Sequence, residues 1–476
     1  MNTNLILNTD SYKTSHYLQY PPQTEYVSSY IESRGGDYPD TLFFGLQMFL
    51  KAYLSRPVSQ ADVDEAEQVL EAHGVPFHRE GWQYILEEHK GYLPLEIQAV
   101  AEGSVVPTGN VLLQVVNTDP KCPWLTSYVE TALLRAVWYA TTVATRSRAC
   151  REVIRQALVD TADSAEGLEL KLQDFGARGT SSEESAAIGG AAHLVNFDGT
   201  DTISGILAAR RYYGADMPGV SIPAAEHSTI TCWGQEREAE AYANMLQQFA
   251  GAGRVLAVVS DSYDLFHAVD NIWGDTLKQH VATCGGTVVI RPDSGDPVQI
   301  VVETIQRLMM RFGYTENRKG YRVLPPHVRV IQGDGISVES IRQILNMMKL
   351  KRLSAANITF GMGGELLQRL DRDTLKFAMK ASAVCVADEW RDVFKNPVTD
   401  RGKRSKRGRL ALIYTEAGYS TIRETDLAGR ANQLRTVFRN GELLVDENFQ
   451  EVRERARRAS VGAECAAEVV PKRSMV

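Results

Sequence analysis

Four short apolar runs in the second half of the chain constrain its fold more than any other feature. They are rich in β-branched residues and occupy Val255–Ser260, Thr287–Ile290, Val328–Gln332 and Ile358–Phe360. A turn rich in glycine and aspartate follows each run, then a helix-like stretch, and the runs begin roughly 30 to 40 residues apart, as βα units do. Apolar and polar residues do not alternate cleanly along these runs, which is typical of parallel strands covered on both faces. The pattern predicts an α/β domain built on a barrel or an open sheet.

The polar turns lie at the carboxyl ends of these strands, where barrels and open α/β sheets place their active sites. The turns at residues 333–335 and 361–364 expose backbone N–H groups at helix starts, and such groups bind phosphate. The other two turns place Asp261 and Asp293 at strand ends, the latter close to Arg291. Carboxylates there can hold Mg²⁺ or orient a histidine while the arginine binds phosphate, and a purely structural Arg–Asp pair is an equal alternative.

A single histidine, His227, lies in the segment Pro218–Thr231 and directly follows Glu226. Prolines and a glycine restrict or bend the backbone before it, and Ser228 or Thr229 can cap a helix that continues through Trp233 and beyond. A histidine at a strand-to-helix junction has its ring nitrogens available for chemistry. A buried polar residue in a turn is the alternative, and the polar turns that follow along the chain favour chemistry.

Two earlier motifs carry side chains suited to binding a flat ligand. Phe175 precedes Arg178 by three residues, with Gly176 between them and Gly179 directly after the arginine. The phenylalanine is either a core residue or a platform on which a heterocycle stacks. Asp201 either caps a helix or accepts a hydrogen bond from a ligand N–H group. Taken one at a time, the structural interpretations are favoured.

Outside the βα units, helical and strand-like stretches alternate. The predicted elements are a short strand and a helical turn within 5–20, a strand over 26–33, helices within 59–90, strands within 93–117, a long helix over 124–160, and a charged helix over 450–458. The N-terminal third therefore reads as a mixed α+β module. The small, polar tail from Ser460 is predicted to be disordered.

Composition narrows the class of protein. The length of 476 residues predicts two or three domains, and 44% hydrophobic with 23% charged residues is typical of a soluble globular protein. A net charge of −7 argues against nucleic acid and anionic membranes as partners. The six cysteines form no C-x-x-C pair, which predicts reduced thiols in the cytoplasm. A signal peptide and an apolar run of membrane-spanning length are both missing from the sequence.

An anionic substrate would need local cations in so acidic a chain. Arg34 precedes two glycines, as a plain turn or as a cation on a flexible loop that faces phosphate. Residues 403–409 form a dense basic run, which is either a solvated loop, a nucleic-acid patch or a loop that meets a polyphosphate. The polyphosphate interpretation fits the rest of the chain best.

With these residues in view, the chain resembles the nicotinamide phosphoribosyltransferases, which are type II phosphoribosyltransferases. The similarity extends from Thr9–Lys13 to about Arg409, and several long blocks in one order are more specific than any short motif. The other matching blocks are Asp174–Gly179, His193–Thr202, Ser221–Thr229, Ser260–Asp264, Ile290–Gly295, Val330–Gly335 and Lys403–Arg409. Ala257, where the family often has serine, and the run Gly361–Gly364 are small departures.

The resemblance implies transfer of a ribose 5-phosphate group from phosphoribosyl pyrophosphate to nicotinamide, which yields nicotinamide mononucleotide and pyrophosphate in NAD salvage. ATP would be a co-substrate, hydrolysed through a phosphohistidine with Mg²⁺. The implied fold is an incomplete α/β barrel over residues 166–392 with a sheet-rich α+β domain formed by 1–165 and 393–476. The implied assembly is a homodimer with active sites at its interface.

The resemblance also assigns roles to individual residues. The nicotinamide pocket would comprise Phe175, Arg178, Asp201 and Arg291, with the partner subunit's Tyr12 and the partner's Asp10. The phosphorylated histidine would be His227, with Glu226, Asp261 and Asp293 around it and Mg²⁺ at the two aspartates. Ribose and its 5′-phosphate would bind Gly333, Asp334, Gly363, Gly364 and Arg372. The pyrophosphate or ATP phosphates would bind Arg34, Lys395, Lys403 and Arg409.

Three alternatives remain beside this interpretation. A nicotinate-specific phosphoribosyltransferase is disfavoured because Asp201 would accept from a carboxamide but repel a carboxylate. A non-catalytic scaffold on the same fold is disfavoured by the intact set of His227, Asp261, Arg291 and Asp293. An unrelated phosphosugar enzyme on a barrel would explain the glycine turns but not the aromatic–arginine motif.

Overall fold

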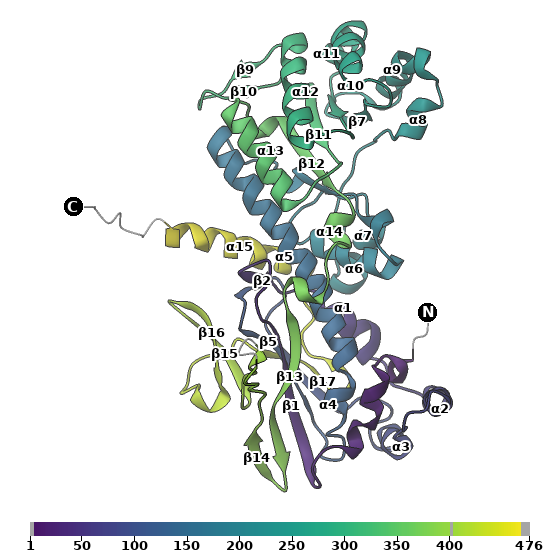
Figure 1. Cartoon of the computed structure of the whole chain (residues 1–476), viewed down its shortest axis with the longest axis vertical. Helices are drawn as coiled ribbons and strands as arrows, with labels where there is room; N and C mark the ends of the chain where they lie inside the picture. The colour runs from purple at the N-terminus through teal and green to yellow at the C-terminus, as the bar shows by residue number, and fades with distance from the viewer. Residues whose placement is uncertain (1–3, 400–402, 468–476) are drawn as a thin grey trace, which may run out of the picture. The chain divides into compact units, whose positions relative to one another are not determined.

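The computed structural model describes residues 4–399 and 403–467, with side chains as far as Arg458. The chain forms two compact units, coloured by residue number in Figure 1. The sheet unit combines Met1–Thr145, Ala208–Ala215 and Leu370–Val476, and the barrel unit combines Arg146–Leu207 and Asp216–Arg369. Both ends of the chain therefore contribute to the sheet unit, as the predicted fold class requires.

The barrel unit is built on a five-stranded parallel sheet in the order β6-β12-β11-β8-β7. The strands are β6 (Leu172–Asp174), β7 (Val255–Val259), β8 (Thr287–Arg291), β11 (Val328–Gln332) and β12 (Ile358–Met362). The last four are the strands predicted from the apolar runs. Parallel bridges continue both edges of the sheet, from Asp174 to Thr200 and from Ala257 to Ala224. The sheet curls into a half-barrel, which confirms the predicted incomplete α/β barrel.

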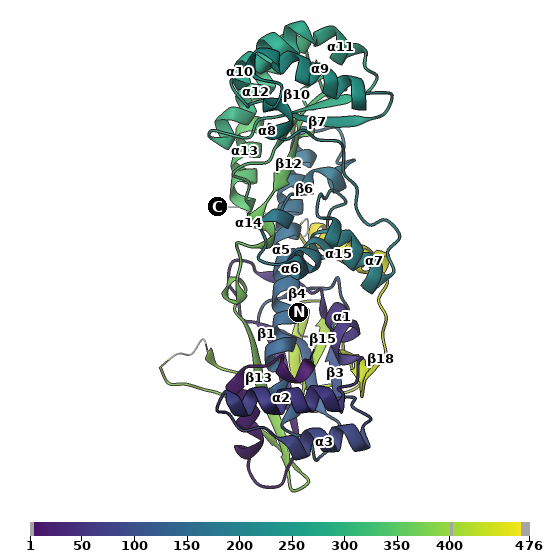
Figure 2. The ribbon, with the colours of Figure 1, turned by 90° about the vertical axis from the view of Figure 1, so that its right-hand side faces the viewer.

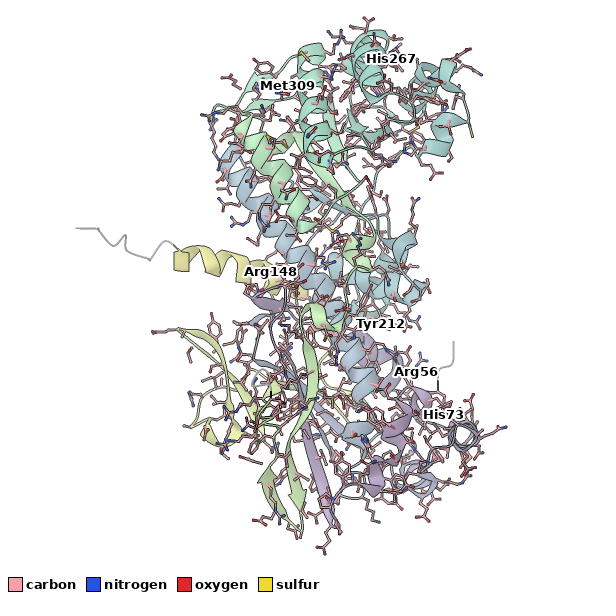
Figure 3. All side chains as sticks on the ribbon, viewed as in Figure 1. Arg56, His73, Arg148, Tyr212, His267 and Met309 are labelled. Carbon is pink, nitrogen blue, oxygen red and sulfur yellow. The ribbon has the colours of Figure 1, made fainter. Side chains whose placement is uncertain are left out.

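Helices connect these strands, and their ends carry ordinary capping signals. The helices are α6 (Glu183–His193), α7 (Ile203–Tyr213), α8 (His227–Thr231), α9 (Glu238–Phe249), α10 (Leu265–His267), α11 (Lys278–Thr283), α12 (Pro297–Phe312), α13 (Val338–Leu350) and α14 (Gly364–Leu367). The second half of α7, from Ala208, is counted with the sheet unit. Asp296 caps α12 by accepting the Gln299 N–H at 2.9 Å, and a proline occupies the first turn. Ile305, Leu308 and Met309 form part of the buried face of α12, and Figure 3 labels Met309 among all the side chains.

The sheet unit contains a seven-stranded antiparallel sheet in the order β14-β13-β1-β5-β3-β17-β18. Its strands are β1 (Thr24–Ser33), β3 (Leu95–Ala99), β5 (Val111–Asn117), β13 (Phe377–Val386), β14 (Glu389–Asp392), β17 (Arg435–Arg439) and β18 (Glu442–Leu443). Two small sheets pair β2 (Asp40–Leu42) with β4 (Val105–Pro107) and β15 (Leu410–Thr415) with β16 (Gly418–Arg423). The interior strand β1 pairs with β13 from the other end of the chain.

Helices and an aromatic core complete the sheet unit. Its helical segments include α1 (Leu46–Phe49), α2 (Gln60–Ala72), α3 (Arg79–Glu88), α4 (Leu125–Tyr128), α15 (Phe449–Ala467) and the first part of α5 (Glu130–Thr161). Figure 2 shows α2 and α3 side by side, in agreement with their contacts. The rings of Trp82, Trp124 and Tyr128 meet edge to face with centroids 5.0–5.6 Å apart. These large buried rings fix how the helices pack.

Two predictions at the ends of the chain need correction. Leu5–Leu7 forms a 3₁₀ turn instead of a strand, because the Asn4 side chain accepts the Ile6 N–H at 3.0 Å and starts the turn. The last helix continues to Ala467, past the predicted end at 458 and into the predicted disordered tail. The rest of that tail lies outside the described residues. Among residues 4–399 and 403–467, none of the helices has the length and apolar character needed to cross a membrane.

Candidate active site

A cavity of about 470 Å³ opens at the carboxyl ends of the barrel strands. Its walls come from the barrel unit alone: Phe175, Ala177, Arg178, Asp201, Thr202, Glu226, His227, Ser228, Arg291, Asp293 and Gly333. Segments that are far apart in sequence meet here because each follows a strand of one parallel sheet. Eight of the residues singled out from the sequence line this cavity, and Asp261 adjoins it through His227.

His227 lies at the first position of α8 with its ring facing two carboxylates. Its Nε2 is 3.4 Å from Asp293 Oδ2 and 3.7 Å from Asp261 Oδ1, while Nδ1 is 3.1 Å from Ser262 Oγ. The side chain is 47% exposed, so the ring is open to the cavity and is not a packed core residue. An imidazole whose two nitrogens meet a carboxylate pair and a hydroxyl can hold a proton on one nitrogen and use the other for chemistry.

The helix at His227 is shorter than predicted. Glu226 precedes α8, and its carboxylate accepts the Ser228 hydroxyl, so its place beside the phosphorylated histidine stays a prediction. The helix ends at Thr231 instead of continuing through Trp233, because Gly234 adopts a φ of +85° that the helix cannot continue through. A separate helix, α9, begins four residues later. His227 therefore stands on one isolated helical turn.

Asp261 is a buried carboxylate with one satisfied and one unsatisfied oxygen. Its Oδ2 accepts the Asp293 N–H at 3.0 Å and the Ser294 hydroxyl at 2.5 Å. Its Oδ1 is buried, and no described residue makes a hydrogen bond to it. Arg291 lies behind, with Nη2 3.8 Å from Asp293 Oδ2. The pair of aspartates is therefore held in place by its own turn and leaves acceptor oxygens for another group.

The two aspartates fit a hard cation such as Mg²⁺. An unpaired carboxylate oxygen beside a second carboxylate supplies the donors that this ion takes from proteins, the rest being phosphate and water oxygens. A complete metal cage is not present: within the described part of the chain, no three His, Cys, Asp or Glu side chains are arranged to hold an ion by themselves. The site therefore suits a cation that arrives with a phosphate ligand.

Phe175 forms a platform in the mouth of the half-barrel. Its ring packs on a small cluster of Ala257, Val289 and Ile331. Glycine at 361 is required by this ring, because a Cβ there would lie 2.0 Å from Phe175 Cε2. The ring thus has one face against the barrel interior and borders the cavity.

Asp201 and Arg178 complete the same wall. One oxygen of Asp201, Oδ1, accepts the Ser221 hydroxyl at 2.5 Å, so the side chain is oriented before any ligand binds. Arg178 lies on the 3₁₀ turn Ala177–Gly179 and is exposed at the cavity. A flat ring with a hydrogen-bond donor at its edge can stack on Phe175 and donate to Asp201.

The other predicted residues of the barrel unit lie in two glycine turns. Asp334 follows Gly333 after β11 and is exposed, and Gln332 Nε2 donates to its carbonyl at 2.9 Å. Gly363 and Gly364 begin α14 after β12. These three residues do not line the 470 Å³ cavity, so their predicted role at ribose phosphate stays a prediction.

Seven predicted residues belong to the sheet unit, and their contacts there are local. Asp10 accepts the Thr131 hydroxyl at 2.6 Å, Arg34 Nε is 3.0 Å from Glu32 Oε1, and Arg372 Nη2 is 3.2 Å from Asp373 Oδ1. The ring of Tyr12 is exposed, and so is Lys403, while the Lys395 N–H donates to Ser405 at 2.8 Å. Their assigned roles remain predictions.

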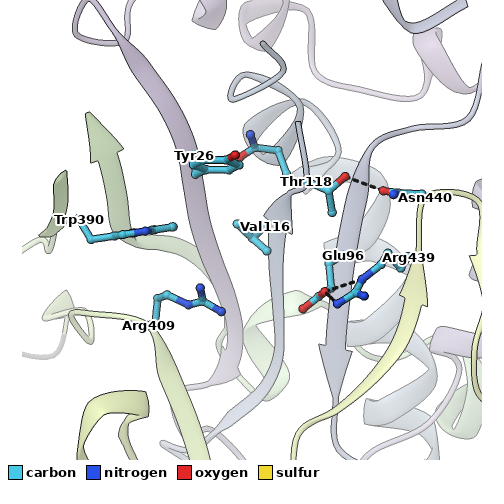
Figure 4. A pocket seen from close by; sticks show the side chains of 9 residues that line it. Tyr26, Glu96, Val116, Thr118, Trp390, Arg409, Arg439 and Asn440 are labelled. Carbon is cyan, nitrogen blue, oxygen red and sulfur yellow. Dashed lines mark hydrogen bonds and ion pairs between the residues drawn. The ribbon is translucent and has the colours of Figure 1, made fainter. Parts of the chain in front are cut away.

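Arg409, the seventh, lies at a separate cavity of about 490 Å³ in the sheet unit (Figure 4). Its guanidinium is 5.4 Å from the centre of the Trp390 ring, which is stacked with Tyr26 at 6.0 Å. Its Nε is 2.8 Å from Glu424 Oε2. The charge of Arg409 is therefore offset by a carboxylate, and its predicted contact with phosphate remains a prediction.

Comparison with known proteins adds independent information. The model of the nicotinate phosphoribosyltransferase (NAPRTase) family matches residues 170–442, and that of the nicotinamide phosphoribosyltransferase N-terminal domain matches residues 4–97. A nicotinamide phosphoribosyltransferase of Xanthomonas campestris is 54% identical over 95% of this chain and 98% of its own length. A nicotinamide phosphoribosyltransferase of Acinetobacter baylyi is 33% identical over 94% of this chain and 95% of its own length.

The chain belongs to the nicotinamide phosphoribosyltransferases. It is therefore a phosphoribosyltransferase, as the resemblance in its sequence implied. Solved structures agree on the fold. Nicotinate-nucleotide pyrophosphorylase from Pyrococcus furiosus superposes with a TM-score of 0.62, at 17% identity over 96% of both chains. Human nicotinic acid phosphoribosyltransferase gives 0.51, at 17% identity over 95% of this chain and 93% of its own.

Sequence reasoning missed the polar residues that support this phosphoribosyltransferase site. Three serines orient its charged groups: Ser221 at Asp201, Ser262 at His227 and Ser294 at Asp261. Two of them, Ser262 and Ser294, stand in the strand-end turns already singled out, so a hydroxyl next to each predicted carboxylate was an available signal. The contact from Ser221 spans 20 residues and has no local signal.

Proposed function

We propose that this enzyme transfers the phosphoribosyl group of phosphoribosyl pyrophosphate to nicotinamide, with ATP hydrolysis through a phosphohistidine at His227, in NAD salvage. The observation that supports it best is the meeting of three groups in one cavity: the Phe175 platform, the Asp201 carboxylate and the exposed imidazole of His227. The 54% identity to a nicotinamide phosphoribosyltransferase supports the same substrates. Nicotinamide mononucleotide and pyrophosphate are the products.

Phe175, Arg178 and Asp201 form one wall of the cavity, which we call the base wall. This wall accounts for the preference for an uncharged amide over an acid. The pyridine ring stacks on Phe175, and its carboxamide N–H₂ donates to the Asp201 oxygen that Ser221 leaves free. A nicotinate carboxylate at the same place would meet Asp201 as a like charge, which disfavours the acid. When the ring nitrogen bonds to C1 of the ribose, the ring becomes cationic, and its contact with Phe175 gains roughly 0.5–2 kcal/mol.

The part of the cavity near Arg291, Asp261 and Asp293 stabilises the negative charge of the leaving pyrophosphate. As the bond from C1 to pyrophosphate breaks, the ribose gains oxocarbenium character and the leaving oxygens gain charge. Arg291, 15% exposed behind the aspartates, can donate to these oxygens. Mg²⁺ bound with the pyrophosphate at Asp261 and Asp293 would supply further positive charge there. The aspartates hold that position through the Asp293 N–H and the Ser294 hydroxyl.

His227 is the acceptor proposed for the γ-phosphoryl group of ATP. With the proton on Nε2, the ring points its N–H toward Asp261 and Asp293, and the Nδ1 lone pair, which accepts the Ser262 hydroxyl in the free enzyme, is the nucleophile once that hydroxyl turns away. The carboxylates then stabilise the cationic ring that forms when Nδ1 bonds to phosphorus. The terminal bridging bond of ATP breaks, and its electron pair leaves with ADP.

A homodimer is part of the proposal. In the barrel unit, five large apolar side chains beside Asp201 are exposed: Ile203, Leu207, Met217, Val220 and Ile222. In the sheet unit, Tyr12 and Leu18 are 59% and 66% exposed. Exposed large apolar side chains that lie close together in the sequence are typical of an interface, and a second copy would bring its own Tyr12 and Asp10 to the base wall. We place the enzyme in the cytoplasm, which suits the five free cysteines found among the described side chains.

The test is an assay of purified protein with phosphoribosyl pyrophosphate and Mg²⁺, with nicotinamide or nicotinate, and with or without ATP. Product from nicotinamide, increased by ATP, is expected, and a preference for nicotinate would favour the acid-specific alternative. His227→Ala is expected to abolish ATP hydrolysis and to leave synthesis weak and independent of ATP. Intact ATP hydrolysis in that variant would rule out the phosphohistidine. No product with either base would favour a non-catalytic role.

A further inference from the structure

Asp174 is a buried carboxylate that the proposed chemistry leaves without a role. It ends β6 directly before Phe175, and the residue is 0% exposed. Moving a carboxylate out of water costs free energy unless hydrogen bonds compensate for it. Burial, with a smaller contribution from the nearby negative charge of Asp201, raises the pKa of Asp174 to about 6. An apolar residue would avoid this cost, so the carboxylate calls for a functional reason.

The backbone of Asp174 joins the two segments that carry the base wall. Its N–H donates to the carbonyl of Gly199 at 3.2 Å, and its own carbonyl accepts the N–H of Asp201 at 2.9 Å. Asp174 and Thr200 form the parallel bridge at this edge of the sheet. Phe175 is the next residue along the chain. The stacking ring and the amide acceptor are therefore anchored at one position.

The side chain fixes the same two segments. Oδ1 accepts the N–H of Gly176 at 2.7 Å, which turns the chain directly after Phe175. The hydroxyls of Thr202 and Thr200 lie close enough to lower the pKa of the carboxylate, although no described residue makes a hydrogen bond of normal geometry to Oδ2. The carboxylate thus stands between the turn that carries Phe175 and the segment that carries Asp201.

We propose that Asp174 is a positioning residue of the base wall, which holds the Phe175 ring and the Asp201 carboxylate at the separation that a pyridine carboxamide requires. Because it is wholly buried, it acts through these two residues and not by contact with the base. The role rests on the proposed function. The role concerns nicotinamide and not phosphoribosyl pyrophosphate. Gly176, Thr200 and Thr202, which surround Asp174, lie on the side of the cavity that binds the base, away from Asp261 and Asp293.

The experiment compares Asp174→Ala with Asp174→Asn, which keeps an oxygen to accept the Gly176 N–H. For alanine, the KM for nicotinamide is expected to rise about tenfold, as loss of a buried hydrogen bond implies, with the KM for phosphoribosyl pyrophosphate within about twofold. Asparagine is expected to stay within about threefold for both. Asp160→Ala is the matched control: its carboxylate meets Lys349 at 2.7 Å on the surface of the same unit.

The outcomes separate this role from general damage and from the proposed function. Equal increases in both KM values, or a fall in kcat alone, would mean a structural role and overturn the proposal. An alanine variant equal to wild type would overturn it while the proposed function stands. If wild type neither binds nor converts nicotinamide, the positioning role and the proposed function are both ruled out. If the alanine variant fails to fold, the asparagine variant provides the test. A tenfold rise in its nicotinamide KM would show that the hydrogen bond to the Gly176 N–H does not position the base wall, and would overturn the proposal.

Discussion

At the scale of single residues, hydroxyl groups orient the charges of the candidate site. Asp201 illustrates this, since Ser221 occupies one of its oxygens and leaves the other for a ligand. The sequence pointed to Asp201 as an acceptor, but it could not show which oxygen is free, because the partner lies 20 residues away. Residue types at strand ends were therefore predictable, and their orientation was not.

Asp201→Asn should weaken the preference for the amide. Asparagine keeps an acceptor and a similar shape but removes the negative charge that repels nicotinate. The ratio of kcat/KM for nicotinamide to that for nicotinate is expected to fall about tenfold or more, as removal of one close like-charge contact implies. Parallel assays with both bases measure it. An unchanged ratio would mean that another residue discriminates between acid and amide.

Asp174→Asn should also change how stability depends on pH. The folded pKa of Asp174, about 6, lies above its unfolded value, so the folded state binds the proton more tightly. This group therefore favours folding at low pH, and its contribution is lost as pH rises from about 4 to about 6, by up to ~3 kcal/mol. Asp201 is the charged neighbour, and Gly176, Thr200 and Thr202 supply the polar contacts.

Chemical unfolding at pH 4.5 and pH 7.5 measures this effect. Wild type is expected to lose stability from pH 4.5 to pH 7.5, because the Asp174 carboxyl group loses its proton. The asparagine variant has no such proton, so its stability relative to wild type is expected to rise between the two pH values. Asp160→Asn serves as the control, because pairing with Lys349 lowers the pKa of Asp160, so its contribution changes only below about pH 4 and no change between the two pH values is expected. A pH-independent difference for Asp174→Asn would show that its carboxyl group has the same pKa in the folded and unfolded states.

At the scale of elements, the parallel strands were predictable because buried β-branched runs carry a strong signal. The isolated turn α8 was not, since its end depends on the positive φ of Gly234 and on a chain direction that no local pattern encodes. The same holds for Leu5–Leu7, where one side-chain cap from Asn4 decides against a strand. Short elements are set by single contacts, and those contacts become visible only in the structure.

Gly361→Ala tests how β12 supports the aromatic platform. The new Cβ would lie 2.0 Å from the Phe175 ring, so the ring must move out of its place on the barrel. The KM for nicotinamide is expected to rise about five- to thirtyfold, from loss of a stacking contact of about 1–2 kcal/mol. Gly251→Ala is the control, because its nearest neighbour, Arg254 Cδ, is at 3.5 Å. Equal nicotinamide KM values for the two variants would exclude the platform.

At the scale of the whole molecule, the sequence indicated a barrel and a sheet-rich part formed by both chain ends. It gave no signal for where the chain divides, because α5 continues without interruption from Glu130 to Thr161 across the point between Thr145 and Arg146. The boundaries suggested at 165 and 393 stay predictions. Assembly is likewise beyond a single sequence, although the exposed Tyr12 makes it testable.

Mixing two inactive variants tests whether active sites are shared between subunits. Tyr12→Ala is expected to lose base binding and His227→Ala to lose ATP coupling. In a heterodimer of the two, one site combines an intact His227 with the partner's intact Tyr12, and the other carries both changes. Random exchange makes half of the dimers mixed, so about a quarter of the ATP-coupled activity should return. Each variant mixed with itself gives the baseline. If the mixture stays at that baseline while mass measurements confirm exchange, Tyr12 and His227 act within one subunit, and the base wall is complete without a partner.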